Sequence, residues 1–94
     1  MTTLRFRIHA VLQMDERAIS VSDVWLALAS GTEIETRPDD HPYPARLVLG
    51  FTPTGAVHIA VRDNIVDDEI IVETVYRPSP DLWAPDLKTR RRLR

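Results

Sequence analysis

The stretch RLVLGFTPTGAVHIAV, residues 46–61, decides the fold. Apolar side chains alternate along it on both sides of a Pro53-Thr54-Gly55 turn, at Leu47, Leu49 and Phe51 and then at Val57, Ile59 and Val61. Alternation is typical of strands with one buried face, and so short a turn joins antiparallel neighbours, so the stretch predicts a β-hairpin. His58 is out of phase with Val57 and Ile59, which places it on the opposite face of the sheet. The simplest interpretation is that His58 is an ordinary surface histidine, and the alternative is that this face of the sheet forms a cleft.

Further strands flank this hairpin. After a polar turn over residues 64–68, alternation resumes at Ile70, Val72, Thr74 and Tyr76. On the N-terminal side, residues 32–36 can form a short edge strand, and the proline-rich residues 38–44 make a stiff loop before the hairpin. Short consecutive connections favour an antiparallel meander of three to four strands.

Two helices are expected before these strands. Apolar residues recur at steps of three and four between Leu4 and Ala18, which predicts a first helix with one core-facing stripe. Ser20 and Asp23 form a capping-box pattern that begins a second helix, and Gly31 stands where a left-handed cap would end it near Ser30. The expected fold is therefore α+β, with two N-terminal helices packed on one face of a three- to four-stranded antiparallel sheet.

The 94 residues suffice for one domain, which we expect to span residues 1–87. Residues 88–94 hold five of the twelve basic side chains and no acidic one, so they are predicted to form a basic tail, most simply a solvated one. The remaining body is acidic and would repel nucleic acid at long range. No stretch is apolar enough for a signal peptide or a membrane span, and cysteine is absent, so a cytoplasmic protein without disulfides or membrane contact is expected.

Residues that could carry chemistry are few. The sequence lacks a glycine-rich phosphate loop and the usual zinc spacings, and His41 in its acidic loop is more simply solvated than metal-bound, so no cofactor or metal is expected. His9, Gln13 and Arg17 follow one another at steps of four, which stacks them along one side of the first predicted helix. A histidine close to a guanidinium suits phosphodiester chemistry. Trp83 is expected to be a packing anchor.

Six short blocks occur in order over about residues 5–80: HA at 9–10, MDERAIS at 14–20, DV at 23–24, RLVLG at 46–50, VHIAV at 57–61 and IVETVYRP at 71–78. Together they resemble the bacterial family called domain of unknown function 4258 (DUF4258). That family looks related to the RelE, BrnT and MqsR toxins, which are compact α+β ribonucleases, and its members often lie beside a zinc-finger antitoxin of the YgiT or MqsA kind. The chain departs from the pattern at Gln13, where many members have arginine, and at Ala18, where glycine is common.

The resemblance implies a set of candidate catalytic residues: His9, Arg17, Arg46 and Tyr76. Candidate substrate-binding residues are Thr74, His58 and Gln13. His9 would act as general base or acid, and the two arginines would stabilise negative charge on a phosphorane.

The function expected from this resemblance is that of a metal-independent endoribonuclease toxin, in which the ribose 2′-hydroxyl attacks the adjacent phosphate and the 5′-oxygen leaves. RNA and a zinc-finger antitoxin would be its partners. One alternative is a non-catalytic protein-binding module that uses an edge strand or the basic tail on the same scaffold. Another is a homodimer of unknown role.

Overall fold

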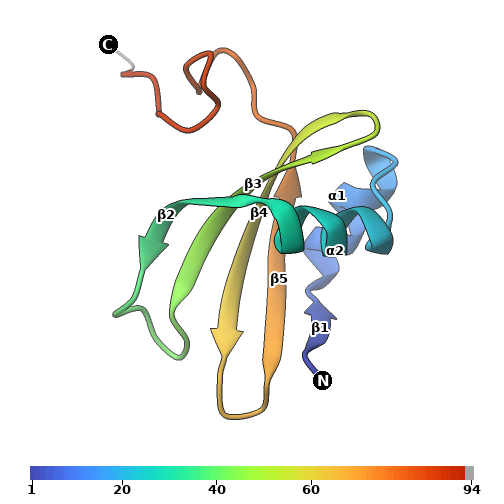
Figure 1. Ribbon diagram of the computed structural model, residues 1–94, viewed down its shortest axis with the longest axis vertical. Coiled ribbons are helices and arrows are strands. Elements are labelled where there is room, and N and C mark those ends of the chain that lie inside the picture. The colour runs from blue at the N-terminus through green and yellow to red at the C-terminus, as the bar shows by residue number, and fades with distance from the viewer. Residues whose placement is uncertain (93–94) are drawn as a thin grey trace.

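The computed structural model describes residues 1–92, which form one mixed sheet and two helices (Figure 1). In chain order the elements are β1 (Thr3–Phe6), α1 (Ile8–Glu16), α2 (Val21–Ser30), β2 (Thr32–Arg37), β3 (Ala45–Thr52), β4 (Gly55–Asn64) and β5 (Glu69–Tyr76). The strand order across the sheet is β1-β5-β4-β3-β2. Strands β2 to β5 form the predicted antiparallel meander, whereas β1 pairs with β5 in parallel.

The α+β class is confirmed, but the prediction of a three- to four-stranded antiparallel sheet is wrong, because residues 1–92 build five strands, one of them parallel. The extra strand, β1, lies where the first helix was predicted to start. Leu4 and Phe6 pair with Ile70 and Val72 and pack against the core. Leu4 and Phe6, two apart, fit a strand, but Leu4 and Ile8, four apart, also fit a helical stripe. A run of four residues is too short for the pattern to separate the two. The helix α1 begins only at Ile8.

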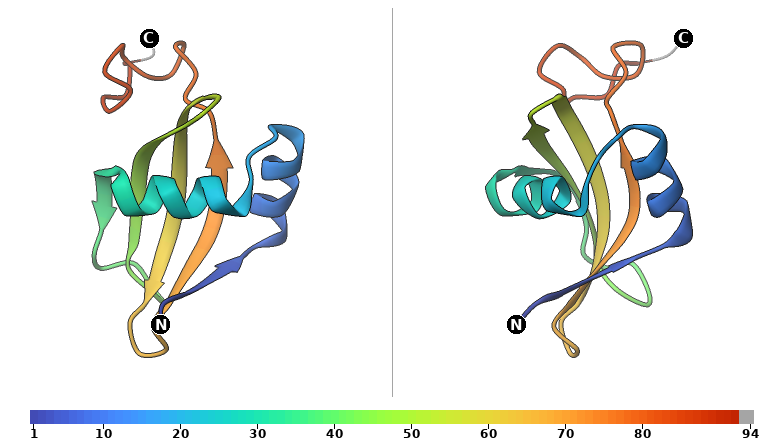
Figure 2. Two further views of the ribbon diagram at one scale, coloured as in Figure 1. Left: turned by 45° about the vertical axis from the view of Figure 1, so that its right-hand side comes forward. Right: turned by 90° about the vertical axis from the view of Figure 1, so that its right-hand side faces the viewer.

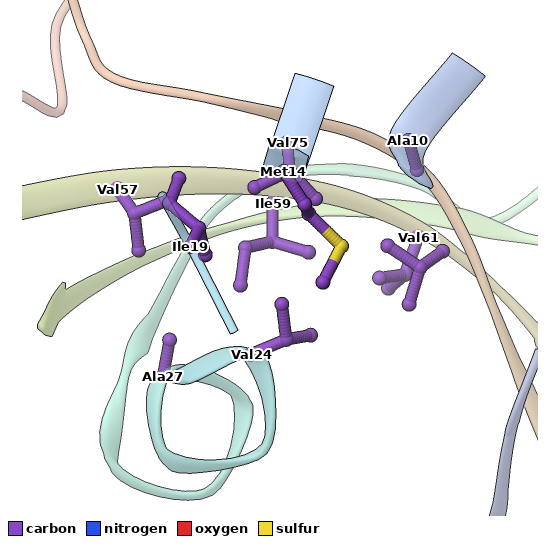
Figure 3. Packing of buried hydrophobic residues seen from close by; sticks show 10 residues of the cluster. Ala10, Met14, Ile19, Val24, Ala27, Val57, Ile59, Val61 and Val75 are labelled. Carbon is purple, nitrogen blue, oxygen red and sulfur yellow. The ribbon is translucent and has the colours of Figure 1, made fainter. Parts of the chain in front are cut away.

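Both helices contribute to one apolar core with β4 and β5 (Figure 3). Ala10 and Met14 come from α1, and Val24 and Ala27 come from α2, which runs across the strands (Figure 2). The capping box predicted at Ser20 and Asp23 is confirmed by two reciprocal hydrogen bonds of 3.0 Å each.

Two glycines let α2 approach the sheet closely. Gly31 has a φ of −81°, so the predicted left-handed cap is wrong. A Cβ at Gly31 would lie 2.3 Å from the carbonyl oxygen of Ala27, and one at Gly50 would lie 2.4 Å from the Cβ of Ala27. These positions therefore need glycine because the backbones of α2 and β3 are in contact.

The C-terminal segment, residues 77–92, folds back across one end of the sheet (Figures 1 and 2). Trp83 is the packing anchor predicted from the sequence, since only 2% of its surface is exposed. Arg90 and Arg91, from the predicted basic tail, bond to Glu35 and to the carbonyl oxygens of Pro80 and Trp83. The last two residues of that predicted tail lie outside the described residues. Within residues 1–92, no helix is both long and apolar enough to span a membrane.

Ala18 adopts a left-handed backbone conformation, with φ of 53°, in the turn between the helices. A Cβ is disfavoured there, so Ala18→Gly should stabilise the protein by about 0.5–1 kcal/mol in urea unfolding. The control is Ala29→Gly, because Ala29 is an exposed residue within α2 and glycine should cost about 0.5–1 kcal/mol at a helical position. Equal destabilisation by both changes would contradict the assigned conformation of Ala18.

Candidate functional site

A groove of about 260 Å³ lies on the face of the sheet opposite the helices. Leu47 and Ala60, which pair across β3 and β4, line this groove, whereas their chain neighbours Val48, Ile59 and Val61 are buried on the helix side. The polar side chains of the groove come from three strands and the C-terminal segment: Glu35, Thr36, Arg37, Arg62, Glu73, Thr74, Tyr76 and Arg90. A bulge in the β4–β5 pairing between Ala60 and Val61 brings Glu73 and Thr74 together to the groove.

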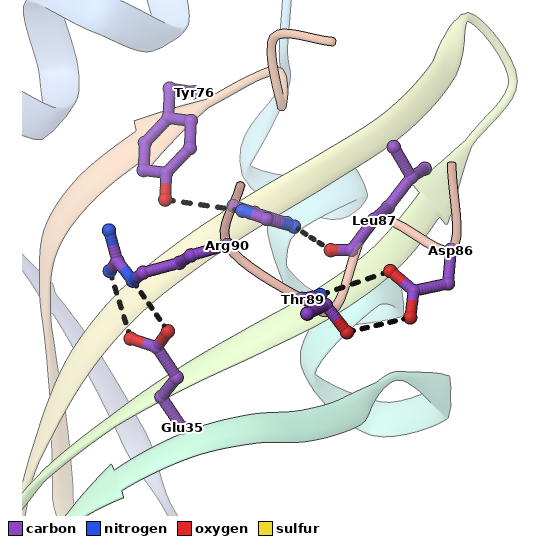
Figure 4. Close-up of polar contacts among 7 residues, drawn as sticks. Glu35, Tyr76, Asp86, Leu87, Thr89 and Arg90 are labelled. Carbon is purple, nitrogen blue, oxygen red and sulfur yellow. Dashed lines mark hydrogen bonds and ion pairs between the residues drawn. The ribbon is translucent and has the colours of Figure 1, made fainter. Parts of the chain in front are cut away.

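At one end of the groove lies Tyr76, which is labelled in Figure 4. It contacts a fully buried histidine, His58. His58 Nε2 lies 2.7 Å from the carbonyl oxygen of Leu87, and Nδ1 lies 3.1 Å from the hydroxyl of Tyr76. A carbonyl oxygen can only accept, so Nε2 carries a hydrogen. In the neutral ring Nδ1 is then an acceptor, and the Tyr76 hydroxyl donates its proton to it.

Burial sets the protonation of this pair. It lowers the pKa of His58 below the usual 6.5, against the opposing effects of the Leu87 carbonyl and Glu35. Burial also raises the pKa of Tyr76 above its usual 10.0. Trp83 packs edge-on against His58, with ring centroids 4.4 Å apart. At neutral pH the pair therefore consists of a neutral imidazole and a protonated phenol.

Three guanidinium groups line the groove, and two of them are already paired with carboxylates. Arg62 Nε lies 2.8 Å from Glu73 Oε1, and its Nη1 donates to the carbonyl oxygen of Tyr43 at 3.0 Å. Arg90 makes two hydrogen bonds to Glu35, of 2.7 and 2.9 Å. Arg37 takes part in none of the ion pairs formed among residues 1–92. The groove thus mixes three cations with two anions.

Of the residues predicted from the sequence, the structure brings Tyr76, Thr74 and His58 together. His58 lies on the predicted face of the sheet, but the prediction that it is a surface residue is wrong, because the C-terminal segment covers its side chain. Sequence periodicity could not reveal that cover, since residues 77–92 form no helix or long strand with a recognisable pattern.

His9 and Gln13 lie on α1, Arg17 is the residue that caps its C-terminal end, and none of the three lines the groove. Beyond Val72, the outer edge of β5 is covered by α1 instead of β1, and Gln13 Oε1 accepts from the backbone amide of Val75 at 2.8 Å. Gln13 therefore satisfies an edge amide of the sheet. Arg17 bonds to Glu16 and to the carbonyl oxygen of Gln13, and His9 is exposed.

The guanidinium of Arg46 is paired with carboxylates outside the groove. It forms two hydrogen bonds with Asp63, of 2.8 and 3.1 Å, and an ion pair with Glu33 at 3.5 Å. The bond to Asp63 raises the pKa of Arg46 further. Arg46 belongs to the wall of the groove, but strand alternation directs its side chain to the face of Val48 and Val61, which is the helix side. Its guanidinium is therefore a structural clamp between β2, β3 and β4.

Sequence reasoning missed Arg37, Arg62 and Arg90. Arg62 could have been found, because it is in phase with His58 and Ala60 along β4 and so shares their face. Arg37 and Glu35 likewise share one face of β2. No local pattern connects Arg90 with Glu35, which precedes it by 55 residues.

Comparison with known proteins identifies the family but not its activity. The family model described as domain of unknown function (DUF4258) matches residues 6–77, which agrees with the blocks that carried the resemblance. No curated protein and no solved structure matches the chain. Within the described residues 1–92, no group of three or more histidine, aspartate or glutamate side chains is placed to hold a metal ion. The family match spans most of the chain, and the protein therefore belongs to the DUF4258 family.

Proposed function

We propose that this protein is a metal-independent endoribonuclease of the toxin kind, with the groove as its active site. The observation that carries the proposal is the hydrogen bond from the groove-lining Tyr76 to the buried, neutral His58. In a typical acid–base site, a nucleophile or acid is hydrogen-bonded to a base, and a third group orients that base. Here the third group is the carbonyl oxygen of Leu87.

In the proposed reaction Tyr76 and His58 together act as the general base. The Tyr76 oxygen takes the proton of a ribose 2′-hydroxyl while its own proton passes to His58 Nδ1. The 2′-oxygen then bonds to the adjacent phosphorus, the bond from phosphorus to the 5′-oxygen breaks, and the leaving oxygen takes a proton from water. The products are a 2′,3′-cyclic phosphate and a 5′-hydroxyl, and His58 returns its proton to solvent through Tyr76.

The arginines of the groove would stabilise the phosphorane. Arg37, Arg62 and Arg90 reach the groove from β2, β4 and the C-terminal segment, so they surround the space beside Tyr76 and Thr74. Fixed cations near developing negative charge contribute more in a partly enclosed site than in water. Thr74 would donate to a phosphate oxygen. His9 has no part in this proposed reaction, because it is an exposed residue of α1 that does not line the groove.

A kinship with the RelE, BrnT and MqsR toxins, and control by a zinc-finger antitoxin in the cytoplasm, remain parts of this proposal. The pairing of Arg62 with Glu73 and of Arg90 with Glu35 favours a second candidate, a groove that binds a partner protein without catalysis. Internal carboxylates compete with phosphates for the guanidinium groups, whereas a partner with its own mixed charges could replace each contact.

The proposal is tested by incubating the purified protein with a long unstructured RNA in EDTA. We expect cleavage that leaves 2′,3′-cyclic phosphate ends, and growth arrest of a bacterial host on induced expression. His9→Ala should cleave as fast as the wild-type protein, because His9 lies outside the groove. Intact RNA and normal growth would reject the enzymatic proposal, and a stable complex with a neighbouring gene product would then support the binding module.

A further inference from the structure

The most exposed polar contact of the groove is the bidentate pair between Arg90 and Glu35 (Figure 4). Arg90 Nε and Nη2 each donate to a different oxygen of the Glu35 carboxylate. Two parallel hydrogen bonds from one planar guanidinium are also the geometry by which arginine binds a phosphate. The Glu35 carboxylate therefore fills a fork that would fit two oxygens of a phosphodiester equally well.

The guanidinium of Arg90 is held in place independently of Glu35. Its central carbon lies 4.7 Å from the centroid of the Trp83 ring, and Trp83 is buried against His58. The backbone amide of the next residue, Arg91, donates to the carbonyl oxygen of Leu82 at 2.8 Å. Arg90 would thus keep its position beside Tyr76 if Glu35 moved away, because stacking and backbone contacts remain.

Glu35, by contrast, can be displaced. The side chain of Arg90 is 61% exposed and that of Glu35 is 34% exposed, so water and ligands reach the pair. Exposed ion pairs are weaker than buried ones and are weakened further by salt, so even this bidentate pair can exchange its carboxylate for another anion. A phosphate group that also contacted Arg37 or Tyr76 would gain more than Glu35 loses.

We propose that Arg90 is a phosphate-binding residue of the groove and that Glu35 occupies its binding fork in the free protein as an internal competitor. By competing for Arg90, Glu35 lowers the affinity of the groove for a nucleic-acid backbone. The inference rests on the proposed function in that it takes the ligand to be RNA. It concerns binding alone and does not depend on whether the RNA is cleaved.

The test is binding of a fluorescent oligodeoxynucleotide, which has no 2′-hydroxyl and cannot be cleaved by the proposed reaction, measured by anisotropy at low salt. We expect Glu35→Gln to bind about three- to fivefold more tightly than the wild-type protein. The matched control is Glu33→Gln, which removes the same charge from the same strand at a residue outside the groove. Among residues 1–92 Glu33 forms an ion pair only with Arg46, so its replacement should have less than a twofold effect.

A double-mutant cycle decides whether the gain passes through Arg90. Arg90→Gln should weaken binding about tenfold. When Glu35→Gln is added to Arg90→Gln, the affinity should change by no more than Glu33→Gln changes that of the wild-type protein. Equal affinities of Glu35→Gln and Glu33→Gln, or a full gain without Arg90, would overturn the inference. RNA cleavage that depends on Tyr76 could still stand in that case. Conversely, a gain through Arg90 without any RNA cleavage would leave this inference standing and reject the enzymatic proposal.

Discussion

Tyr76→Phe should lower the rate of RNA cleavage by about 10²–10⁴-fold, the contribution typical of a general acid–base group. The change removes only the hydroxyl that donates to His58 and lines the groove. It also leaves His58 Nδ1 buried without a donor, so we expect a loss of stability of about 1–3 kcal/mol as well. Single-turnover cleavage at a temperature where the variant is fully folded, checked by circular dichroism, separates the two effects.

The matched control is Tyr43→Phe, because Tyr43 is the other tyrosine of the chain and lies outside the groove. Its hydroxyl accepts a long hydrogen bond of 3.4 Å from Asn64, so its loss should leave the cleavage rate within about twofold. Equal rates for Tyr76→Phe and Tyr43→Phe would remove Tyr76 from the mechanism.

The pH dependence of the wild-type reaction gives a second readout. The base must be neutral His58, and burial lowers the pKa of His58 below 6.5. As pH falls, activity should therefore persist through 6.5 and disappear only at lower pH, where protonated Nδ1 can no longer accept from Tyr76. A titration of His58 by NMR, compared with the same chain unfolded in urea, should show the same downward displacement. An acid limb at or above 6.5 would contradict the assignment of His58 as base.

The hairpin of β3 and β4 could be recognised from the sequence because both strands have a clear period of two. The alternation at Val57, Ile59 and Val61 survives in the structure as one buried face of β4. The strand β1 could not be recognised, because its parallel partner lies 66 residues away and only four residues carry its pattern. The second helix was recognised from its capping box, which is a local interaction and so is visible in the sequence.

The site was harder to predict than the fold, because strands and a returning segment bring its residues together. The predicted helical row of His9, Gln13 and Arg17 is incomplete, because α1 ends at Glu16. The helix also lies along the edge of β5, away from the groove. The partners of His58 come from residues 76 to 87, and only the folded chain reveals that Leu87 reaches its ring. Periodicity shows which face a residue occupies, but it does not show what covers that face.

Trp83→Ala should cost about 3–5 kcal/mol in urea unfolding followed by far-ultraviolet circular dichroism, a loss typical of a buried tryptophan. Trp83 lies between His58 and Arg90, with 2% of its surface exposed. Its loss should free the C-terminal segment, withdraw the Leu87 carbonyl from His58 and thereby abolish RNA cleavage. Trp25→Ala is the matched control, because the only other tryptophan is 41% exposed on α2 and its loss should cost less than about 1 kcal/mol.

Comparison of the two tryptophan variants tests whether residues 77–92 position His58 or are a dispensable tail. If residues 77–92 hold the acid–base pair in place, Trp83→Ala must also expose the ring of His58, which proton exchange or chemical modification with diethyl pyrocarbonate would detect. Burial is what lowers the pKa of His58, so that pKa should rise towards 6.5 in the variant. Equal stability of Trp83→Ala and Trp25→Ala, with His58 still protected, would mean that the C-terminal segment does not position His58. The sheet face alone would then have to account for any activity of the groove.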